Sequence, residues 1–484
     1  MAEKSLKDKT ISGVGWTAAE TVLRYGVSFI VGIILARLLS PDEYGLIGIL
    51  TIFITIFEII IDGGFINALI RKQDAQDIDY YTVFWTNLLL SIMMAGILYA
   101  GSGFIAKFFE RDELIPLMHV MSSIVIINAL SLVQKARLTK ALDFKTQTKV
   151  SVIAAVCSGF IGIWMAYAGY GVWALVAQQL SNAGIATLLF WLFNRWLPKL
   201  HFSIESFQNM WNFGWKLLIS GLLNNLSGQL SHAVIGKCFS PATLGQFTRG
   251  HQFGTLFSSN TTSIVQRVTF PVLSEIQDDP VRLKDAYRRV IRITVFPTFV
   301  MMMTLAACAK PLLVVLIGEK WIEAAYFLQI MSFSLMLNPL HALNLNAIQV
   351  MGRSDLTLRI NIIKNLLVII PIAIGILTNI YWMLVADVIR GYICYYLNAH
   401  YSKPLLNYSI GEQIIDIFPS FKYALLMAIP TFLLSFLPFI AWVVLIIQTI
   451  FVFFVGIAFY MKSQLYEIKA IKEILFEYKQ KIKK

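Results

Sequence analysis

The chain has 484 residues, of which 57% are hydrophobic and only 14% charged, and its mean hydropathy is +0.68. A soluble domain is nearer to about 45–50% apolar and about 25% charged, so this composition excludes a soluble enzyme. The formal net charge of +12 raises the possibility of a nucleic-acid partner. The positions of the basic residues along the chain test that possibility below. Lipid can solvate the excess of apolar side chains directly. We therefore predict an all-α polytopic membrane protein.

Taking about 20 apolar residues per span, the sequence predicts fourteen transmembrane helices. In chain order they lie near residues 11–38, 44–62, 82–105, 116–136, 149–168, 172–193, 213–236, 249–272, 291–316, 324–350, 359–378, 380–400, 421–438 and 440–461. The charged segment before the first span is interpreted as a retained signal anchor.

Lysine and arginine are distributed unequally between the two sides of these spans. Fourteen spans place both termini on one side, and the segments on that side hold 23 basic residues, whereas the opposite loops hold only Lys107, Arg111, Lys237 and Lys320. Cytoplasmic loops are the ones enriched in such residues, which predicts cytoplasmic N- and C-termini. The net charge is then mainly a topology signal and indicates no nucleic-acid partner. Residues 463–484 are predicted to form a basic amphipathic cytoplasmic tail on anionic lipid.

An internal repeat divides the chain. The segment from Ala36 to Gly45 returns 200 residues later, from Gly236 to Gly245, with a basic residue, Ser-Pro and Gly in register. Weaker echoes at offsets between 199 and 212 pair Gly15-Trp16 with Gly214-Trp215, Thr82-Val83-Phe84 with Thr294-Val295-Phe296, and Trp173 with Trp382. Chance similarity is the alternative, because Ser-Pro commonly ends helices.

The repeat predicts the domain organisation. Residues 1–200 form an N-terminal lobe of helices 1–6, residues 201–405 a C-terminal lobe of helices 7–12, and residues 406–462 add helices 13 and 14. Six helices per repeat is an even number, so both lobes enter the membrane from the same side and the repeat is parallel. Such an architecture places a cavity between two lobes that can rock, which suggests a transporter.

Polar side chains within the spans are the candidate site residues, because a charge at mid-membrane costs about 2.5 kcal/mol or more unless it meets water or a partner. Glu20 and Arg24 share one face of helix 1, and Asp387 and Arg390 are three residues apart in helix 12. Either pair is equally well explained as a structural ion pair. The candidate substrate-binding residues are Arg24, Arg267, Arg390, Asn225, Gln229, Asn260 and Asn338, and the candidate ion-coupling residues are Glu20, Glu58 and Asp387. Lys216, Arg292, Lys364 and Lys422 lie near predicted cytoplasmic helix ends, where long side chains snorkel to the headgroups.

The sequence predicts no enzyme. It has no Walker A sequence, no GxSxG, no CxxC and no paired histidines of metal-binding spacing. We therefore expect no catalytic residue, metal site or cofactor, apart from H⁺ or Na⁺ as a coupling ion.

Six segments in order resemble the bacterial polysaccharide exporters of the colanic-acid and teichuronic-acid type, which belong to the MOP superfamily. They are Leu35 to Gly45, Asp62 to Ile70, Thr82 to Trp85, Ala141 to Lys145, Gly169 to Val176 and Gly318 to Trp321. The resemblance implies a fourteen-helix flippase in the bacterial cytoplasmic membrane. Such a protein moves undecaprenyl-diphosphate-linked oligosaccharide units outward by alternating access, for capsule, exopolysaccharide or O-antigen-type assembly. The implied partners are the lipid-linked oligosaccharide, membrane lipids and the polysaccharide polymerase machinery.

No motif of these exporters transfers an individual cationic residue, so Arg24 and Arg267 rest on position and chemistry. Diphosphate favours Arg, and sugars favour amides and aromatic faces. Two alternatives stay open: a drug or cation antiporter of the same superfamily, whose cavity should be dominated by acids and aromatics, and a membrane polysaccharide polymerase or ligase, which should need a large external loop.

Overall fold

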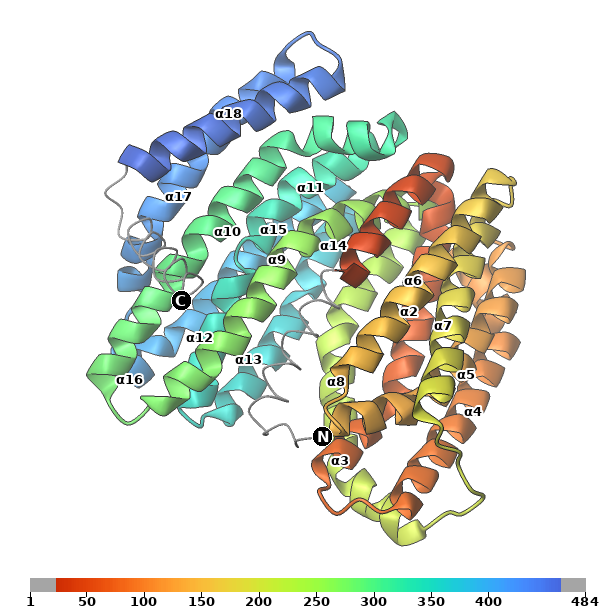
Figure 1. Cartoon of the computed structure of the whole chain (residues 1–484). Coiled ribbons are helices and arrows are strands. Elements are labelled where there is room, and N and C mark those ends of the chain that lie inside the picture. The colour runs from red at the N-terminus through yellow and green to blue at the C-terminus, as the bar shows by residue number, and fades with distance from the viewer. Residues whose placement is uncertain (1–22, 463–484) are drawn as a thin grey trace, which may run out of the picture. The chain divides into compact units, whose positions relative to one another are not determined.

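The computed structural model describes residues 23–462. The chain divides between Gly245 and Gln246 into two compact units, Met1–Gly245 (unit 1) and Gln246–Lys484 (unit 2). Each unit is treated separately. Glu20 and the tail predicted at 463–484 lie outside the described residues, as do the side chains of Asn260 and Arg267. The secondary structure of the described residues is helical throughout (Figure 1).

Unit 1 is a bundle of long helices that follow a helical segment at residues 23–38 (Figure 1). Its helices are α2 (Pro41–Asp62), α3 (Phe65–Arg71), α4 (Asp77–Phe109), α5 (Leu114–Lys140), α6 (Phe144–Tyr167), α7 (Val172–Asn194) and α8 (Ile204–Cys238), and α9 (Pro241–Glu275) starts within it. Helix α8 packs on α2, α3 and α4. The compact unit thus extends past residue 200, where the repeat is predicted to restart. The predicted domain boundaries come from the sequence repeat, whereas the compact units come from contacts in the structure. The predicted boundaries therefore stay predictions.

Local sequence explains where these helices start. Ser40 caps α2 by accepting a hydrogen bond from the Glu43 backbone N–H, while the Glu43 side chain accepts one from the Ser40 backbone, and Pro41 occupies the first turn. Asp143 and Ser203 cap α6 and α8 in the same way through their side chains. Such caps satisfy backbone N–H groups that a helix leaves free at its start.

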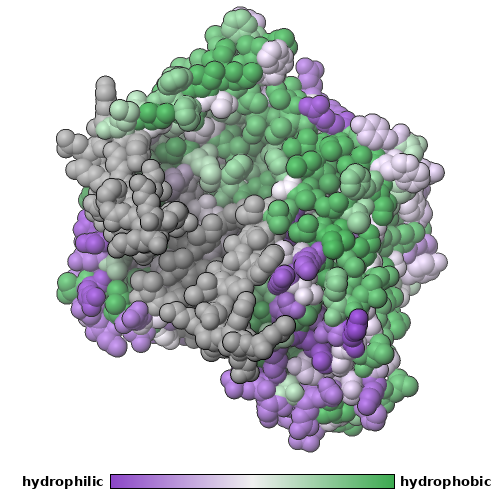
Figure 2. All heavy atoms as spheres, in the orientation of Figure 1, coloured by the Kyte–Doolittle hydropathy of each residue, from purple (hydrophilic) through white to green (hydrophobic). Residues whose placement is uncertain are grey.

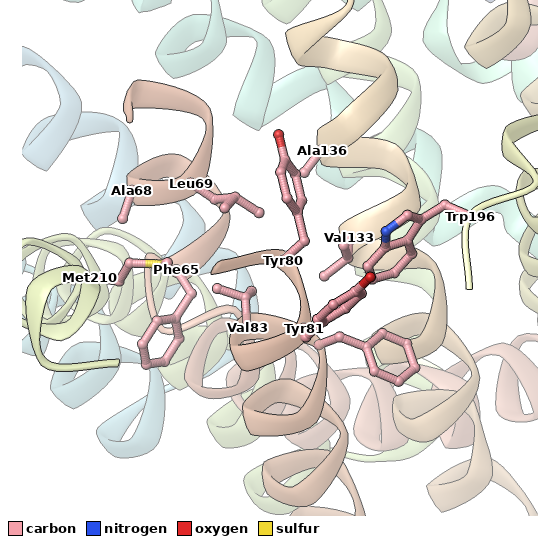
Figure 3. Close-up of a cluster of buried hydrophobic side chains, with 11 residues drawn as sticks. Phe65, Ala68, Leu69, Tyr80, Tyr81, Val83, Val133, Ala136, Trp196 and Met210 are labelled. Carbon is pink, nitrogen blue, oxygen red and sulfur yellow. The ribbon is translucent and has the colours of Figure 1, made fainter. Parts of the chain in front are cut away.

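A buried aromatic core fixes one end of unit 1 (Figure 3). Tyr81 stacks on Trp196 with ring centroids 5.7 Å apart, and Gln134 donates a 2.9 Å hydrogen bond to the Trp196 carbonyl. Beside this core Lys72 makes a 2.8 Å ion pair with Asp79, which raises the pKa of Lys72. The loops after α3 and α7 are therefore held against α4 and α5.

Unit 2 is also a helical bundle. After α9 it contains α10 (Pro280–Ile317), the 3₁₀ turn η1 (Glu319–Trp321), α11 (Ile322–Leu335), α12 (Asn338–Val350), α13 (Ser354–Leu367), α14 (Ile369–Leu377), α15 (Ile380–His400), α16 (Ser402–Leu406), α17 (Ile410–Leu433), the 3₁₀ turn η2 (Leu434–Phe436) and α18 (Ala441–Lys462). The single helix predicted near 324–350 is wrong, because the helix ends at Leu335 and restarts at Asn338-Pro339. Proline lacks the N–H that a continuous helix needs.

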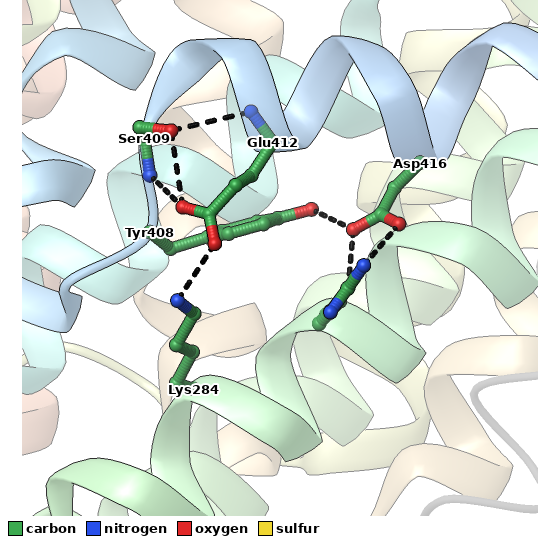
Figure 4. Close-up of polar contacts among 6 residues, drawn as sticks. Lys284, Tyr408, Ser409, Glu412 and Asp416 are labelled. Atoms are coloured by element: carbon green, nitrogen blue, oxygen red, sulfur yellow. Dashed lines mark hydrogen bonds and ion pairs between the residues drawn. The ribbon is translucent and has the colours of Figure 1, made fainter.

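Helix α17 is fastened to α10 by charged side chains at its first turns (Figure 4). Lys284 pairs with Glu412 at 2.9 Å, and the Arg288 guanidinium binds Asp416 through two nitrogens. The Tyr408 hydroxyl donates to Asp416 at 2.8 Å. Burial and this neighbouring carboxylate raise the pKa of Tyr408. These contacts attach the α17–α18 pair to the rest of unit 2.

The apolar character of the chain is confirmed. Within residues 23–462, nine helices are long and apolar enough to cross a membrane. Figure 2 shows hydrophobic residues over much of the visible face and hydrophilic ones gathered at the end of unit 1 where α3 lies. The chain is thus a multi-pass α-helical membrane protein. The number fourteen stays a prediction, since helix 1 is only partly described and the break between α11 and α12 leaves two short helices.

Candidate functional site

Unit 1 contains a polar cavity of about 690 Å³. Its walls come from residues 23–38 and from α2, α5, α6 and α7. The hydrophilic lining residues are Arg24, Ser28, Thr51, Thr55, Glu58, Asn128, Ser131, Lys135, Ser151, Gln178, Gln179 and Asn182. So many polar groups inside a membrane bundle are costly unless they line a hydrated path or bind a ligand. This cavity is the candidate functional site.

One acid lies in the cavity wall. The Asn128 amide on α5 donates a 2.5 Å hydrogen bond to Glu58 Oε1 on α2. Glu58 has no salt-bridge partner in the described part of the chain. Its carboxyl group is therefore held by a neutral amide and lines the cavity.

Two cations share this cavity. Arg24 lies on the residue 23–38 segment with its guanidinium 4.8 Å from the centre of the Tyr25 ring, and Lys135 lies on α5. Glu20, the predicted partner of Arg24, lies outside the described residues. Sequence reasoning missed Lys135, although Asn128, Ser131 and Lys135 follow the i, i+3, i+7 spacing of one helix face. That spacing was the available signal.

The structure places the other predicted residues elsewhere. Asp387 and Arg390 form a 2.7 Å ion pair on α15, and Asn338 on α12 donates a 3.0 Å hydrogen bond to Ser258 on α9, all in unit 2. Asn225 is exposed and bonds to its own helix at the Gly221 carbonyl. Gln229 is half-buried on α8. Of the ten candidates, the described structure brings only Arg24 and Glu58 into the unit 1 cavity, and the roles assigned to all ten stay predictions.

The starts of α2 and α9, which carry the repeated Ser-Pro sequence, touch within unit 1. A Cβ atom on Gly45 would lie 1.7 Å from the Pro241 carbonyl oxygen, and one on Gly245 would lie 1.9 Å from the Pro41 carbonyl oxygen. The contact is reciprocal, as expected for two copies of one motif. Only glycine permits the two backbones to approach so closely.

Charged residues surround this helix crossing. The loop after α4 sends Arg111 to Asp42 at the start of α2, at 2.6 Å, and Glu110 to Lys237 at the end of α8, at 2.7 Å. The bond from Lys237 lowers the pKa of the Glu110 carboxyl. One short loop thus bridges both helices at this end of the unit.

Unit 2 contains two apolar cavities along α10, α15 and α17. One, of about 370 Å³, is lined by aromatic side chains such as Phe299, Tyr392 and Phe421. The other, of about 480 Å³, is lined by Met303, Phe333 and other residues that are all apolar except Gln329. Neither has the polar lining of the unit 1 cavity.

Comparison with known proteins gives the family. Residues 34–326 match the model of a family described as "Polysaccharide biosynthesis protein". The chain belongs to this family.

The names of curated relatives agree with this family description. It is 25% identical to the lipopolysaccharide biosynthesis protein WzxC of Escherichia coli (strain K12), over 89% of this chain and 88% of the relative. It is 24% identical to the teichuronic acid biosynthesis protein TuaB of Bacillus subtilis (strain 168), over 73% of each chain. The predicted resemblance to polysaccharide exporters is confirmed.

Solved structures show the same fold. The lipid II flippase MurJ in an inward closed conformation matches with a TM-score of 0.74 at 14% identity, covering 93% of this chain and 98% of MurJ. An inward-facing multidrug resistance MATE transporter of the MOP superfamily matches with a TM-score of 0.61 at 15% identity, covering 80% and 94%. The predicted MOP-type fold is confirmed.

Proposed function

We propose that this protein is a flippase that moves oligosaccharide repeat units, carried on a polyprenyl diphosphate, from the cytoplasmic to the outer leaflet of a bacterial cytoplasmic membrane. It acts as a transporter and not as an enzyme. The observation that carries the proposal is the polar cavity of unit 1, in a member of a polysaccharide biosynthesis family. Its neighbours by fold, a lipid II flippase and a multidrug transporter, are membrane transporters.

The lining of the cavity matches the chemistry of such a ligand. Arg24 and Lys135 supply two positive charges for the diphosphate, and the amides and hydroxyls supply hydrogen bonds for the sugars. Diphosphate and sugars are too polar for the bilayer core, whereas the polyprenyl chain is soluble in it. The apolar cavities along α10, α15 and α17 offer surfaces that suit such a chain.

The position of the cavity suits loading from the cytoplasm. Glu58 is four residues before the end of α2, and Lys135 is five before the end of α5, and both of these ends are cytoplasmic in the predicted topology. The opposite ends carry the Gly45–Gly245 crossing and its ion pairs. Glu58 is the carboxylate we assign to coupling with H⁺ or Na⁺, with Glu20 and Asp387 as the other candidates.

A drug or cation antiporter of the same superfamily is the second candidate. Its cavity should hold several acids and aromatic rings, but the described lining contains one acid, Glu58, and one aromatic residue, Phe190. The two cations favour an anionic ligand. Delivery of the translocated repeat unit to the polysaccharide polymerase machinery is part of the proposal.

The test is a variant with both cavity cations removed. Arg24→Ala with Lys135→Ala should abolish surface polysaccharide and cause the lipid-linked repeat unit to accumulate on the cytoplasmic leaflet, while the protein still inserts. Lys216→Ala is the matched control, because Lys216 is exposed beside Trp215 and lies outside the cavity. Normal export by the double variant would refute the proposed site.

A further inference from the structure

A second cavity of unit 1 lies between α3, the turn after it, and the first half of α8. We call it the seam cavity, and its volume is about 350 Å³. Its lining includes Arg71, Lys72, Asp74, Asn209, Met210 and Phe213. None of these residues lines the polar cavity that contains Glu58. The seam cavity is therefore a separate place in the same unit.

The two walls of the seam cavity are held together by contacts outside it. Lys72 Nζ makes a 2.8 Å ion pair with Asp79 on α4, and Ser206 on α8 donates a 2.6 Å hydrogen bond to the same carboxylate. At the start of α3, a Cβ atom on Gly64 would lie 2.5 Å from the Gly214 carbonyl oxygen, so the backbones of the two walls approach as closely as glycine permits. The cavity is thus a built feature of the fold, and Lys72 is already neutralised by Asp79.

Arg71 is the cation of the seam cavity that is left for a ligand. It is exposed and makes no salt bridge within residues 23–462. Its guanidinium carbon lies 4.5 Å from the centre of the Phe213 ring. A guanidinium that rests on an aromatic face keeps its N–H donors, and these can bind a phosphate group through two parallel hydrogen bonds. The Phe213 ring thus positions Arg71 without using its hydrogen-bonding capacity.

Asp74 adds an acid to the same lining. It lies in the turn after α3, is exposed, and makes no salt bridge in the part of the chain that the structure describes. Arg71 and Asp74 therefore line one cavity without neutralising each other. Since Lys72 is offset by Asp79, the charges available to a ligand are one positive and one negative. Such a lining complements a zwitterion better than it complements an anion.

The position of the seam cavity matches the headgroup layer of a membrane. Figure 2 shows hydrophilic residues gathered at the end of unit 1 where α3 lies. Trp211 and Trp215 of α8 are 40% and 39% exposed, and tryptophans of membrane proteins concentrate at headgroup level. On α8, Asn209, Phe213 and the exposed Leu217 follow one another at intervals of four residues. One side of the helix thus continues from the cavity for about 12 Å with apolar side chains.

We infer that the seam cavity binds a zwitterionic phospholipid of the phosphoethanolamine type. Arg71 binds the phosphate, Asp74 binds the ammonium group, and an acyl chain follows Phe213 and Leu217 along α8. In the predicted topology this lipid belongs to the cytoplasmic leaflet. An anionic headgroup would leave Asp74 without a counter-charge, and a sugar could not stack on the face of Phe213 that Arg71 covers. The inference does not depend on the proposed transport, because it assigns a bilayer lipid to a cavity outside the candidate functional site.

The test measures lipid binding to the purified full-length protein by native mass spectrometry. The protein is titrated with phosphatidylethanolamine and with phosphatidylglycerol of identical acyl chains, and the first of these should bind more tightly. Arg71→Gln should raise the Kd for both lipids about fivefold, since both contain the phosphate. Asp74→Asn should raise the Kd for phosphatidylethanolamine alone by a similar factor, because only this lipid has an ammonium group.

Matched variants control for general effects of charge and folding. Arg195→Gln removes an exposed arginine that lies outside the cavity, next to Trp196 of the core that also contains Met210. Asp278→Asn removes an exposed acid between α9 and α10. Both should bind the two lipids as the unsubstituted protein does. Arg71→Lys keeps the charge and should retain most of the affinity, which separates loss of the contact from damage to the fold.

Three results would overturn the inference. One is unchanged affinity for phosphatidylethanolamine in Arg71→Gln, and another is a response of both lipids, or of neither, to Asp74→Asn. The third is a preference of the unsubstituted protein for undecaprenyl diphosphate over phosphatidylethanolamine that Arg71→Gln abolishes, since the cavity would then hold the carrier lipid. Each of these results leaves the proposed function standing. Normal export by the variant that lacks Arg24 and Lys135 would refute the proposed site and leave the seam cavity unaffected.

Discussion

Glu58 and Ser258 occupy equivalent places in two helices that start with the same Ser-Pro sequence. Each accepts a hydrogen bond from an asparagine, Asn128 or Asn338. Only Glu58 can carry a charge that changes with proton or sodium binding. The hydrogen bond is thus a shared structural contact, and the carboxylate is a feature of unit 1 alone, which is why we assign coupling to it.

Replacing Glu58 by Gln should uncouple transport from the ion gradient. Glutamine preserves the shape and can still accept the bond from Asn128, but it neither releases a proton nor holds a cation. One charge moved through 100 mV is worth about 2.3 kcal/mol, or roughly 50-fold in accumulation, and the variant should lose this dependence. The measurement is transport into vesicles with and without an imposed gradient.

Glu319→Gln provides the control for this experiment, because Glu319 is an exposed acid in η1 and is outside the unit 1 cavity. It should retain the response to the gradient. Transport by Glu58→Gln that still follows the gradient would show that the coupling ion binds elsewhere, with Glu20 and Asp387 as the next candidates.

The repeat also brings two helix starts into contact. Helices α2 and α9 cross at their first turns, where the carbonyl oxygens of Pro41 and Pro241 face Gly245 and Gly45. The Asp42–Arg111 and Glu110–Lys237 ion pairs lie beside this crossing. In the predicted topology these first turns lie toward the outside, so we expect the crossing to close the outer end of the unit 1 cavity in the proposed cycle.

Alanine at Gly45 or Gly245 should weaken this closure. Either new Cβ atom would lie less than 2 Å from a carbonyl oxygen, so the helices must move apart. Overpacking of this kind typically costs about 1–3 kcal/mol. Both variants should unfold at lower temperature and transport more slowly, and their effects should be similar because the contact is reciprocal.

Gly96→Ala is the matched control for these variants. Gly96 lies within α4, and a Cβ atom there would have no neighbour within 4 Å. Alanine favours a helix over glycine by about 1 kcal/mol, so this variant should be as stable as the unsubstituted protein or more so. If Gly45→Ala behaves like Gly96→Ala in thermal unfolding and transport, the crossing does not hold the outer end.

At the scale of the whole molecule, the sequence was sufficient to predict an all-helical membrane protein, because hydrophobic spans are decided by composition and length. It could not predict the break before Asn338-Pro339, since proline is also tolerated within α10 at Pro297 and Pro311. Which helix keeps a proline depends on whether its neighbours compensate for the lost hydrogen bond. Such compensation is a property of packing.

The candidate site was only partly predictable for a similar reason. Polar residues in spans identified Arg24 and Glu58, but nothing in one sequence says that Asn128 on another helix reaches Glu58. Lys135 was missed because the spacing of Asn128, Ser131 and Lys135 along one helix face was not considered. Lys364 was assigned to snorkelling because the helix was predicted to start near residue 359, whereas α13 starts at Ser354 and carries Lys364 further from the helix end.

The last prediction concerns the orientation of the chain in the membrane. In a variant whose four native cysteines are replaced by serine or alanine, a cysteine at Tyr170 or Phe439 should react with an impermeant thiol reagent added outside, and one at Gln73 should react only after the membrane is opened. All three side chains are exposed, so differences in labelling report the side of the membrane and not burial. The expectation follows from the excess of 23 basic residues over four, which is too large for one or two substitutions to reverse. Labelling of Gln73→Cys in intact cells with protection of Tyr170→Cys would invert the topology. It would also place the unit 1 cavity at the outer face, where the substrate could not load from the cytoplasm.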